Sequence, residues 1–177
     1  MKFAKLHESI NRDARGEINL SILQRIEANK ITKREAFQQY TAKGGLHDLQ
    51  FNQFGSFHDY TSAKKEIENG QFFTPIEVVE KITKVVNPIG SVLDPCCGSG
   101  RFFNFVDERG CTGIELDPEV YKVARFCFPS ANIERYNANY WDSKGKKFDY
   151  ILTNPPFNIK WGEIMSQSYI LRSSKIW

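Results

Sequence analysis

The sequence predicts an α/β fold in which a parallel sheet is covered by helices and preceded by a smaller helical region. Two observations support this. From Gly70 onward, short apolar runs alternate with helical patterns, which is typical of a parallel sheet with crossover helices. Before Gly70 the apolar periodicity is helical. Ligands bind such sheets beyond the carboxyl ends of the strands, so motifs at those ends are candidate site residues.

The first part of the chain predicts helices. Apolar residues recur on one helical face at Ile18, Ile22, Leu23 and Ile26. Thr32 and Glu35 are spaced as a capping box, which indicates the start of a second helix. We therefore predict an N-terminal helical region over residues 1–55 and a second domain over residues 56–177, with the helices packing as a separate subdomain.

Four strands and three helices are predicted after Gly70. The strand candidates are residues 91–94, 111–116, 132–136 and 148–153, and the helical patterns cover residues 75–86, roughly 100–108, and 118–127. Thr74 and Glu77 are spaced as a capping box with Pro75 at the first helical position, and Asp117 before Pro118 reads as an N-cap. We expect the strands at residues 91–94 and 148–153 to be neighbours.

Composition excludes several classes of protein. The chain has 177 residues, which suffices for one core, and a net charge of +3, which does not make the dense basic face of a self-sufficient duplex binder. The four cysteines form no CxxC pair, so we expect reduced thiols in a cytoplasmic protein and no metal site. No apolar run approaches the roughly 18–20 residues of a membrane span.

The run VLDPCCGSGRF carries the first functional pattern. A strand ends in Asp94, and Gly98 and Gly100 then allow a tight turn in which backbone approaches a ligand closely. Phe103 stands where a dinucleotide fingerprint needs its third glycine, and a Walker loop is also absent. Asp94 would repel a pyrophosphate but suits a cationic amino-acid group. The alternative is a glycine turn that only connects two elements.

The next two strand ends add polar side chains. Glu115 closes the second strand, where a carboxylate can accept both hydroxyls of a ribose, whereas Asp117 is explained as a helix cap. Asn139 and Trp141 follow the third strand. They predict either contacts to a base edge and an adenine ring, or a turn residue and a core aromatic.

Aromatic and amide residues complete the pattern. Two phenylalanines precede Thr74 in GQFFTP, and an aromatic ring attracts a sulfonium group by cation–π interaction. The fourth strand ends in NPPF, where the Asn154 amide oxygen and the Pro155 carbonyl offer two acceptors for one exocyclic amino group. Phe157 can stack on a planar base. A strand simply terminated by prolines is the alternative.

Together, GQFFTP, VLDPCCGSGRF, GIELDP and NPPFNIKWG resemble S-adenosylmethionine-dependent N6-adenine DNA methyltransferases, above all the modification subunits of type I restriction–modification systems. The resemblance implies a Rossmann-like methyltransferase fold. It implies contacts to the cofactor from Phe72, Thr74, Pro75, Asp94, Gly98, Gly100, Glu115 and Asn139. Asn139 stands where many relatives carry an aspartate. A pocket for the flipped target adenine is implied for Asn154, Pro155, Pro156 and Phe157.

The resemblance also implies partners. DNA would be the substrate, and a specificity subunit or another subunit a further partner. We expect the exposed edge of the sheet to be covered by such a subunit, by a second copy, or by the residues from Glu163 onward. The residues from Glu163 onward do not resemble the continuation of the family, so we expect the sheet to lack its C-terminal strands and the chain alone to methylate DNA weakly. The alternatives are a non-catalytic remnant that binds cofactor or a partner, and a methylase of RNA or protein.

Overall fold

A computed structural model of the chain describes residues 15–42, 50–68 and 71–156. Four parallel strands form one sheet in the order β3-β2-β1-β4, with the bounds β1 Val92–Asp94, β2 Cys111–Glu115, β3 Asn132–Arg135 and β4 Tyr150–Ile151. Leu93 of β1 pairs with Thr112 on one side and with Ile151 on the other. The α/β class is confirmed, and so is the expected adjacency of the first and fourth strands.

Five α-helices and three short 3-10 helices are found in the described residues. Their bounds are α1 Arg15–Glu27, α2 Lys33–Gln39, η2 Phe51–Gln53, α3 Phe57–Glu68, α4 Ile76–Val86, η3 Phe102–Phe105, η4 Glu108–Gly110 and α5 Pro118–Cys127. None of the helices in this part of the chain is long and apolar enough to cross a membrane.

Two helix starts follow the sequence prediction. The capping box before α2 is present: the Glu35 N–H donates to Thr32 Oγ1 at 3.2 Å, and the Thr32 N–H donates to Glu35 Oε2 at 2.9 Å. At α5, Asp117 Oδ1 accepts from the N–H groups of Glu119 and Val120, and Pro118 occupies the first turn. Both caps are local in sequence, which is why they can be predicted.

The predicted capping box at Thr74 is wrong. Helix α4 takes Pro75 as its N-cap without any side-chain hydrogen bond, and the Pro75 carbonyl accepts from the N–H groups of Val78 and Val79. Because the helix begins one residue later than expected, Thr74 lies outside the N-cap position. The backbone at the start of α4 is therefore left without a side-chain cap.

The predicted helix over residues 100–108 is also wrong. This stretch forms the two 3-10 helices η3 and η4 instead. Gly100 has φ +82°, in the left-handed region, and the N–H groups of Phe103 and Asn104 donate three residues back to Gly100 and Arg101. The left-handed glycine and the three-residue hydrogen bonds give a tighter helix than the one predicted.

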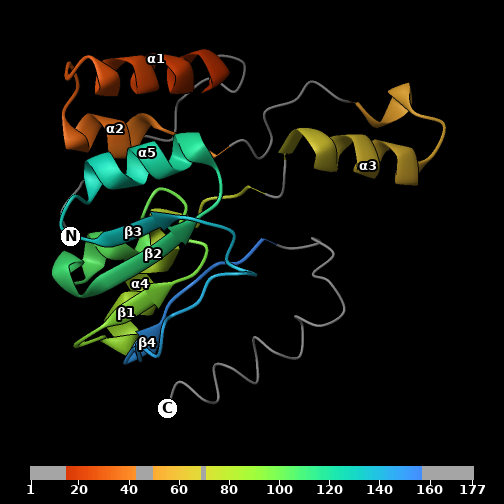
Figure 1. Cartoon of the computed structure of the whole chain (residues 1–177). Coiled ribbons are helices and arrows are strands. Elements are labelled where there is room, and N and C mark those ends of the chain that lie inside the picture. Colours follow the sequence, from red (N-terminus) through yellow and green to blue (C-terminus); the bar gives the residue numbers. More distant parts are fainter. Residues whose placement is uncertain (1–14, 43–49, 69–70, 157–177) are drawn as a thin grey trace.

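The N-terminal helices pack on the α/β layer. Figure 1 shows α1, α2 and α5 side by side above the β3 and β2 part of the sheet. Ile22 of α1 and Phe37 of α2 belong to the same cluster of buried apolar side chains as Val92 of β1 and Phe128 after α5. These described helices thus share a hydrophobic core with the sheet. The domain boundary after residue 55 stays a prediction.

Candidate ligand-binding site

A cavity of about 380 Å³ lies beyond the carboxyl ends of the strands. It lies where the first, second and fourth strand ends meet the segment before α4. Of the residues predicted for a site, the cavity is lined by Phe72, Thr74, Asp94, Gly98, Glu115, Asn139, Asn154 and Pro156. Pro75, Gly100 and Pro155 are sequence neighbours of lining residues but do not line the cavity themselves. Phe157 lies outside the described residues.

Asp94 is a buried carboxylate at the end of β1. Its residue is 1% exposed, and its Oδ1 accepts a hydrogen bond from the Cys96 N–H at 3.1 Å. Burial raises the pKa of Asp94 to about 7, although the nearby Thr153 hydroxyl and the Cys96 N–H oppose the rise. No basic side chain pairs with Asp94 among the described residues. The cavity therefore offers an uncompensated acidic group to a cationic ligand.

The turn after β1 requires its glycines. Gly98 has φ +52°, and a Cβ there would approach the Phe73 ring to 3.1 Å. At Gly100, with φ +82°, a Cβ would come within 2.6 Å of the Phe128 ring. A side chain at either position would be disfavoured for two reasons: the backbone is in the left-handed region, and an aromatic ring lies close to the Cβ position. The turn can approach a ligand through its backbone.

Glu115 connects two turns at the floor of the cavity. Its Oε2 accepts from the Gly98 N–H at 2.9 Å and its Oε1 from the Asp117 N–H at 2.8 Å. Burial raises the pKa of Glu115, while these backbone N–H groups lower it. Each carboxylate oxygen still has a lone pair for a further donor. Glu115 thus holds the glycine turn against the start of α5 and can also accept ligand hydroxyls.

Asn139 brings an unused acceptor to the cavity wall. Its side-chain Oδ1 is buried and has no hydrogen-bond partner, while its backbone N–H donates to Asn137 Oδ1 at 3.0 Å. A buried acceptor without a donor is unfavourable by roughly 1–3 kcal/mol, so a ligand N–H that reached this oxygen would be stabilised.

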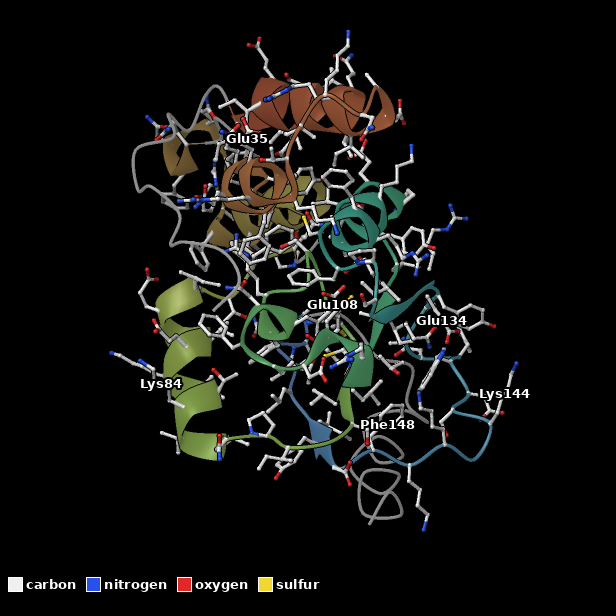
Figure 2. All side chains as sticks on the ribbon, turned by 90° about the vertical axis from the view of Figure 1, so that its left-hand side faces the viewer. Glu35, Lys84, Glu108, Glu134, Lys144 and Phe148 are labelled. Carbon is white, nitrogen blue, oxygen red and sulfur yellow. The ribbon has the colours of Figure 1, made fainter. Side chains whose placement is uncertain are left out.

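Trp141 does not line the cavity. Its Nε1–H donates to Glu134 at 3.1 Å, and its ring lies 6.4 Å from that of Phe148. Glu134 and Phe148 both lie on the side of the strands opposite α4 (Figure 2). Of the two predicted roles for Trp141, the structure favours the packing aromatic over the ring that covers an adenine.

The fourth strand end meets the segment before α4. The Asn154 Nδ2 donates to the Phe72 carbonyl at 3.4 Å, across 82 residues of sequence. Because a carbonyl only accepts, this contact fixes which end of the amide faces Phe72. Asn154 Oδ1 has no hydrogen-bond partner among the described residues and remains available as an acceptor. Phe72 is 53% exposed at the cavity.

Sequence reasoning missed several lining residues. They are Gln71, Phe73, Pro95, Cys96, Cys97, Arg101, Phe102, Ile114, Leu116, Pro118, Tyr136, Asn137 and Ala138, besides Asp117. Gln71 and Phe73 stand within GQFFTP, so their position beside the predicted site residues Phe72 and Thr74 could have indicated that they line the site. Arg101 had a signal too, because an arginine directly after the glycine turn places a cation where ligand binding was expected.

Comparison with known proteins identifies relatives. A family model described as N-6 DNA Methylase matches residues 54–175, so the match takes in the segment after Glu163 that was expected to differ. The modification methylase CviBIII of Paramecium bursaria Chlorella virus NC1A is 31% identical over 113 residues, which cover 59% of this chain and 30% of that protein. The crystal structure of a modification subunit from Vibrio vulnificus YJ016 is 23% identical, with a TM-score of 0.46 over 67% of this chain and 32% of that chain.

Two methylase subunits of type I restriction enzymes are similar as well. That of MjaIX from Methanocaldococcus jannaschii is 32% identical over 126 residues, covering 59% of this chain and 23% of that protein. That of HindI from Haemophilus influenzae is 31% identical over 119 residues, covering 55% of this chain and 27% of that protein. The chain therefore spans between 23% and 30% of the length of these three relatives.

Proposed function

We propose a function that proceeds from one premise: the chain belongs to the N-6 DNA methylase family. Its parallel sheet with flanking helices has the Rossmann-like form of methyltransferases. The proposed function is transfer of a methyl group from S-adenosylmethionine to N6 of adenine in DNA, within a restriction–modification system. One observation carries it: Asp94 and Asn154, from neighbouring strands, line the same cavity.

The polar groups of the cavity fit S-adenosylmethionine. Asp94 would hold the ammonium group, because a buried carboxylate without a basic partner is available for it. Glu115 would accept the ribose hydroxyls, and the orphaned Asn139 Oδ1 would accept the adenine amino group. A cavity of about 380 Å³ falls within the range of ligand pockets.

The segment before α4 would enclose the sulfonium end. Phe72 presents an exposed ring at the cavity, which attracts a cation through its π face. Thr74 lines the same wall, and Pro75 positions it by starting α4. Gly98 and Gly100 would give the ligand access to backbone atoms of the turn.

The bound cofactor supplies an electrophilic methyl group. The residues of this chain then position the acceptor nitrogen. Asn154 Oδ1 and the Pro155 carbonyl would accept hydrogen bonds from the two N6–H groups of a flipped adenine, so that the nitrogen lone pair turns toward the methyl group. Pro156 lines the cavity beside them, and Phe157 would stack on the base. This reaction depends on positioning and electrostatics and is proposed without a metal ion.

The proposed partners are duplex DNA and at least one further subunit or copy. Two of the relatives are methylase subunits of type I restriction enzymes. Within the described residues, β4 pairs only with β1, so one edge of the sheet is open for a further strand or a partner.

The experiment is transfer of labelled methyl from S-adenosylmethionine to duplex DNA, with protein in excess and the DNA digested to nucleosides. We expect label in N6-methyladenine, and Asn154→Ala is expected to remove it. The exposed amide Asn52 lies outside the cavity lining and provides the control Asn52→Ala. Label in RNA or protein but not in DNA would contradict the substrate. Cofactor binding with background transfer for every variant would indicate a non-catalytic protein.

A further inference from the structure

Arg101 is a buried cation at the cavity, directly after Gly100. The residue is 6% exposed and lines the cavity. Its guanidinium carbon lies 5.3 Å from the ring centroid of Phe37 and 5.5 Å from that of Phe73. Both distances are within the range of favourable cation–π interaction. An arginine is thus held between one ring of α2 and one ring of the segment before α4.

The part of the chain that the structure describes satisfies the guanidinium incompletely. Its Nε–H donates to Ser99 Oγ at 3.4 Å, and it forms no ion pair with any described carboxylate. Both rings lie within cation–π range of the guanidinium, and four of its five N–H donors have no hydrogen-bond partner among the described residues. Burial lowers the pKa of Arg101 to about 10, opposed by the charge of Glu77, so the group stays positive at neutral pH.

A buried charge without a counter-ion is unfavourable. A methionine or leucine would fill the space between two phenylalanine rings without that penalty. The described lining of the cavity contains three acids, Asp94, Glu115 and Asp117, and one base, Arg101, and of these Asp94 and Arg101 are almost fully buried. An amino-acid group carries one ammonium and one carboxylate, and the start of α4 beside this wall lacks a side-chain cap. The polar pair in the cavity matches the two charges of such a group.

We propose that Arg101 binds the carboxylate of the methionine portion of S-adenosylmethionine, with Phe37 and Phe73 as positioning residues for its guanidinium. The inference rests on the proposed function, since it takes the same cofactor into the same cavity. Phe37 belongs to α2, which precedes the residues 54–175 matched by the family. Helix α2 would therefore act on the cofactor site through Arg101, without lining the cavity itself.

The test compares two ligands, S-adenosylmethionine and its decarboxylated analogue, by titration calorimetry. Loss of a hydrogen-bonded charge pair predicts that the wild-type chain binds the analogue roughly ten- to a hundredfold more weakly. In Arg101→Met we expect the two affinities to agree within about threefold. Arg101→Lys, which keeps the charge and loses the planar fork, is expected to retain part of the preference.

The clamp, meaning the Phe37 and Phe73 rings that contact the Arg101 guanidinium, is tested with a matched pair of core substitutions. Phe37 and Phe103 are both 0% exposed, and both meet the Phe128 ring edge-on, at 5.7 Å and 5.9 Å. Of these two phenylalanines, Phe37 is the one whose ring lies against the Arg101 guanidinium. Phe37→Leu should therefore reduce the preference for the carboxylated ligand, while Phe103→Leu should lower thermal stability and leave that preference intact.

Each outcome bears on one of the two proposals. A wild-type chain that binds both ligands equally overturns the role of Arg101 and leaves the cofactor assignment standing, and this result needs no variant to fold. An unchanged preference in a folded Arg101→Met protein does the same. If the wild type binds neither ligand, the proposed function fails together with this inference.

Discussion

The two ends of the cavity differ in how firmly the fold holds them. At the end proposed to hold the cofactor (the cofactor end), Asp94 closes β1, all of whose residues are buried, and Glu115 receives two backbone hydrogen bonds. At the end proposed to hold the target base (the base end), Asn154 follows the two-residue strand β4, in which Ile151 is 37% exposed. Within the described residues, the Asn154 side chain makes a single hydrogen bond, of 3.4 Å, to the Phe72 carbonyl.

This difference separates binding from catalysis. The cofactor end is built from central strands with satisfied turns, so we expect the chain to bind S-adenosylmethionine by itself. The base end follows a short strand whose outer edge is unpaired among the described residues. A displacement of about 1 Å can reduce a rate on the order of a hundredfold. Weak methylation by the chain alone is therefore the expected counterpart of firm cofactor binding.

The largest expected effect is a loss of cofactor affinity when Asp94 is substituted. Asp94→Asn keeps an acceptor for the Cys96 N–H but removes the charge that would face the ammonium group. We expect cofactor affinity to fall by about a hundredfold, in line with loss of a buried charge-assisted hydrogen bond. Because burial disfavours the ionised carboxylate, the ligand-free variant should melt at the same or a higher temperature above pH 7. Lower stability with unchanged affinity would make Asp94 structural.

The second effect is a pH dependence that belongs to the same carboxylate. Since the folded pKa of Asp94 is raised from 3.8 to about 7, its contribution to stability is fully present below pH 3.8 and is lost as pH rises to about 7. The loss is at most on the order of 4 kcal/mol in the ligand-free chain. Affinity should change in the opposite direction, rising about tenfold per pH unit up to pH 7. Calorimetry from pH 5 to 8 measures the slope, and Asp94→Asn should abolish it.

A smaller effect is expected at Glu115. Glu115→Gln retains one acceptor oxygen, so it should weaken cofactor binding by roughly tenfold and not abolish it. The variant also loses one of the two acceptors that join Gly98 to Asp117, so a modest fall in melting temperature is expected with it. An affinity equal to that of the wild type would assign Glu115 to the turns alone.

The smallest effect distinguishes a cap from a ligand contact. Asp117 accepts from the N–H groups of Glu119 and Val120, so Asp117→Ala should destabilise the start of α5 by about 1 kcal/mol. Cofactor affinity should change by less than about threefold. Denaturant unfolding and calorimetry on the same preparation separate the two quantities. Abolished binding in Asp117→Ala with intact binding in Glu115→Gln would reverse these assignments.

The parts of the fold that could be predicted are local in sequence. The strand ends at Asp94 and Glu115 and the Asp117 cap follow from short patterns, and the neighbouring positions of β1 and β4 follow from requiring one shared site. The prediction of a capping box at Thr74 was wrong because the sequence Thr-Pro-Ile-Glu also allows the helix to begin after Pro75. Local spacing alone does not decide between the two starts.

The contacts that could not be predicted join distant segments. Asn154 meets the Phe72 carbonyl across 82 residues, and Glu115 binds the Gly98 N–H across 17. The clamp on Arg101 brings together α2, the glycine turn and the segment before α4. Such pairings depend on how helices pack on the sheet, which periodicity does not encode. The motifs indicated which residues form the site, whereas the packing determined which residues they contact.

The most direct test of the difference between the two ends is one calorimetric titration series with S-adenosylmethionine. We expect one-to-one binding to the wild-type chain, an affinity within about twofold of it for Asn154→Ala, and an affinity about a hundredfold lower for Asp94→Asn. A wild-type chain that binds no cofactor, or an Asn154→Ala chain that loses binding as completely as Asp94→Asn, would contradict a cofactor end that is complete without the base end.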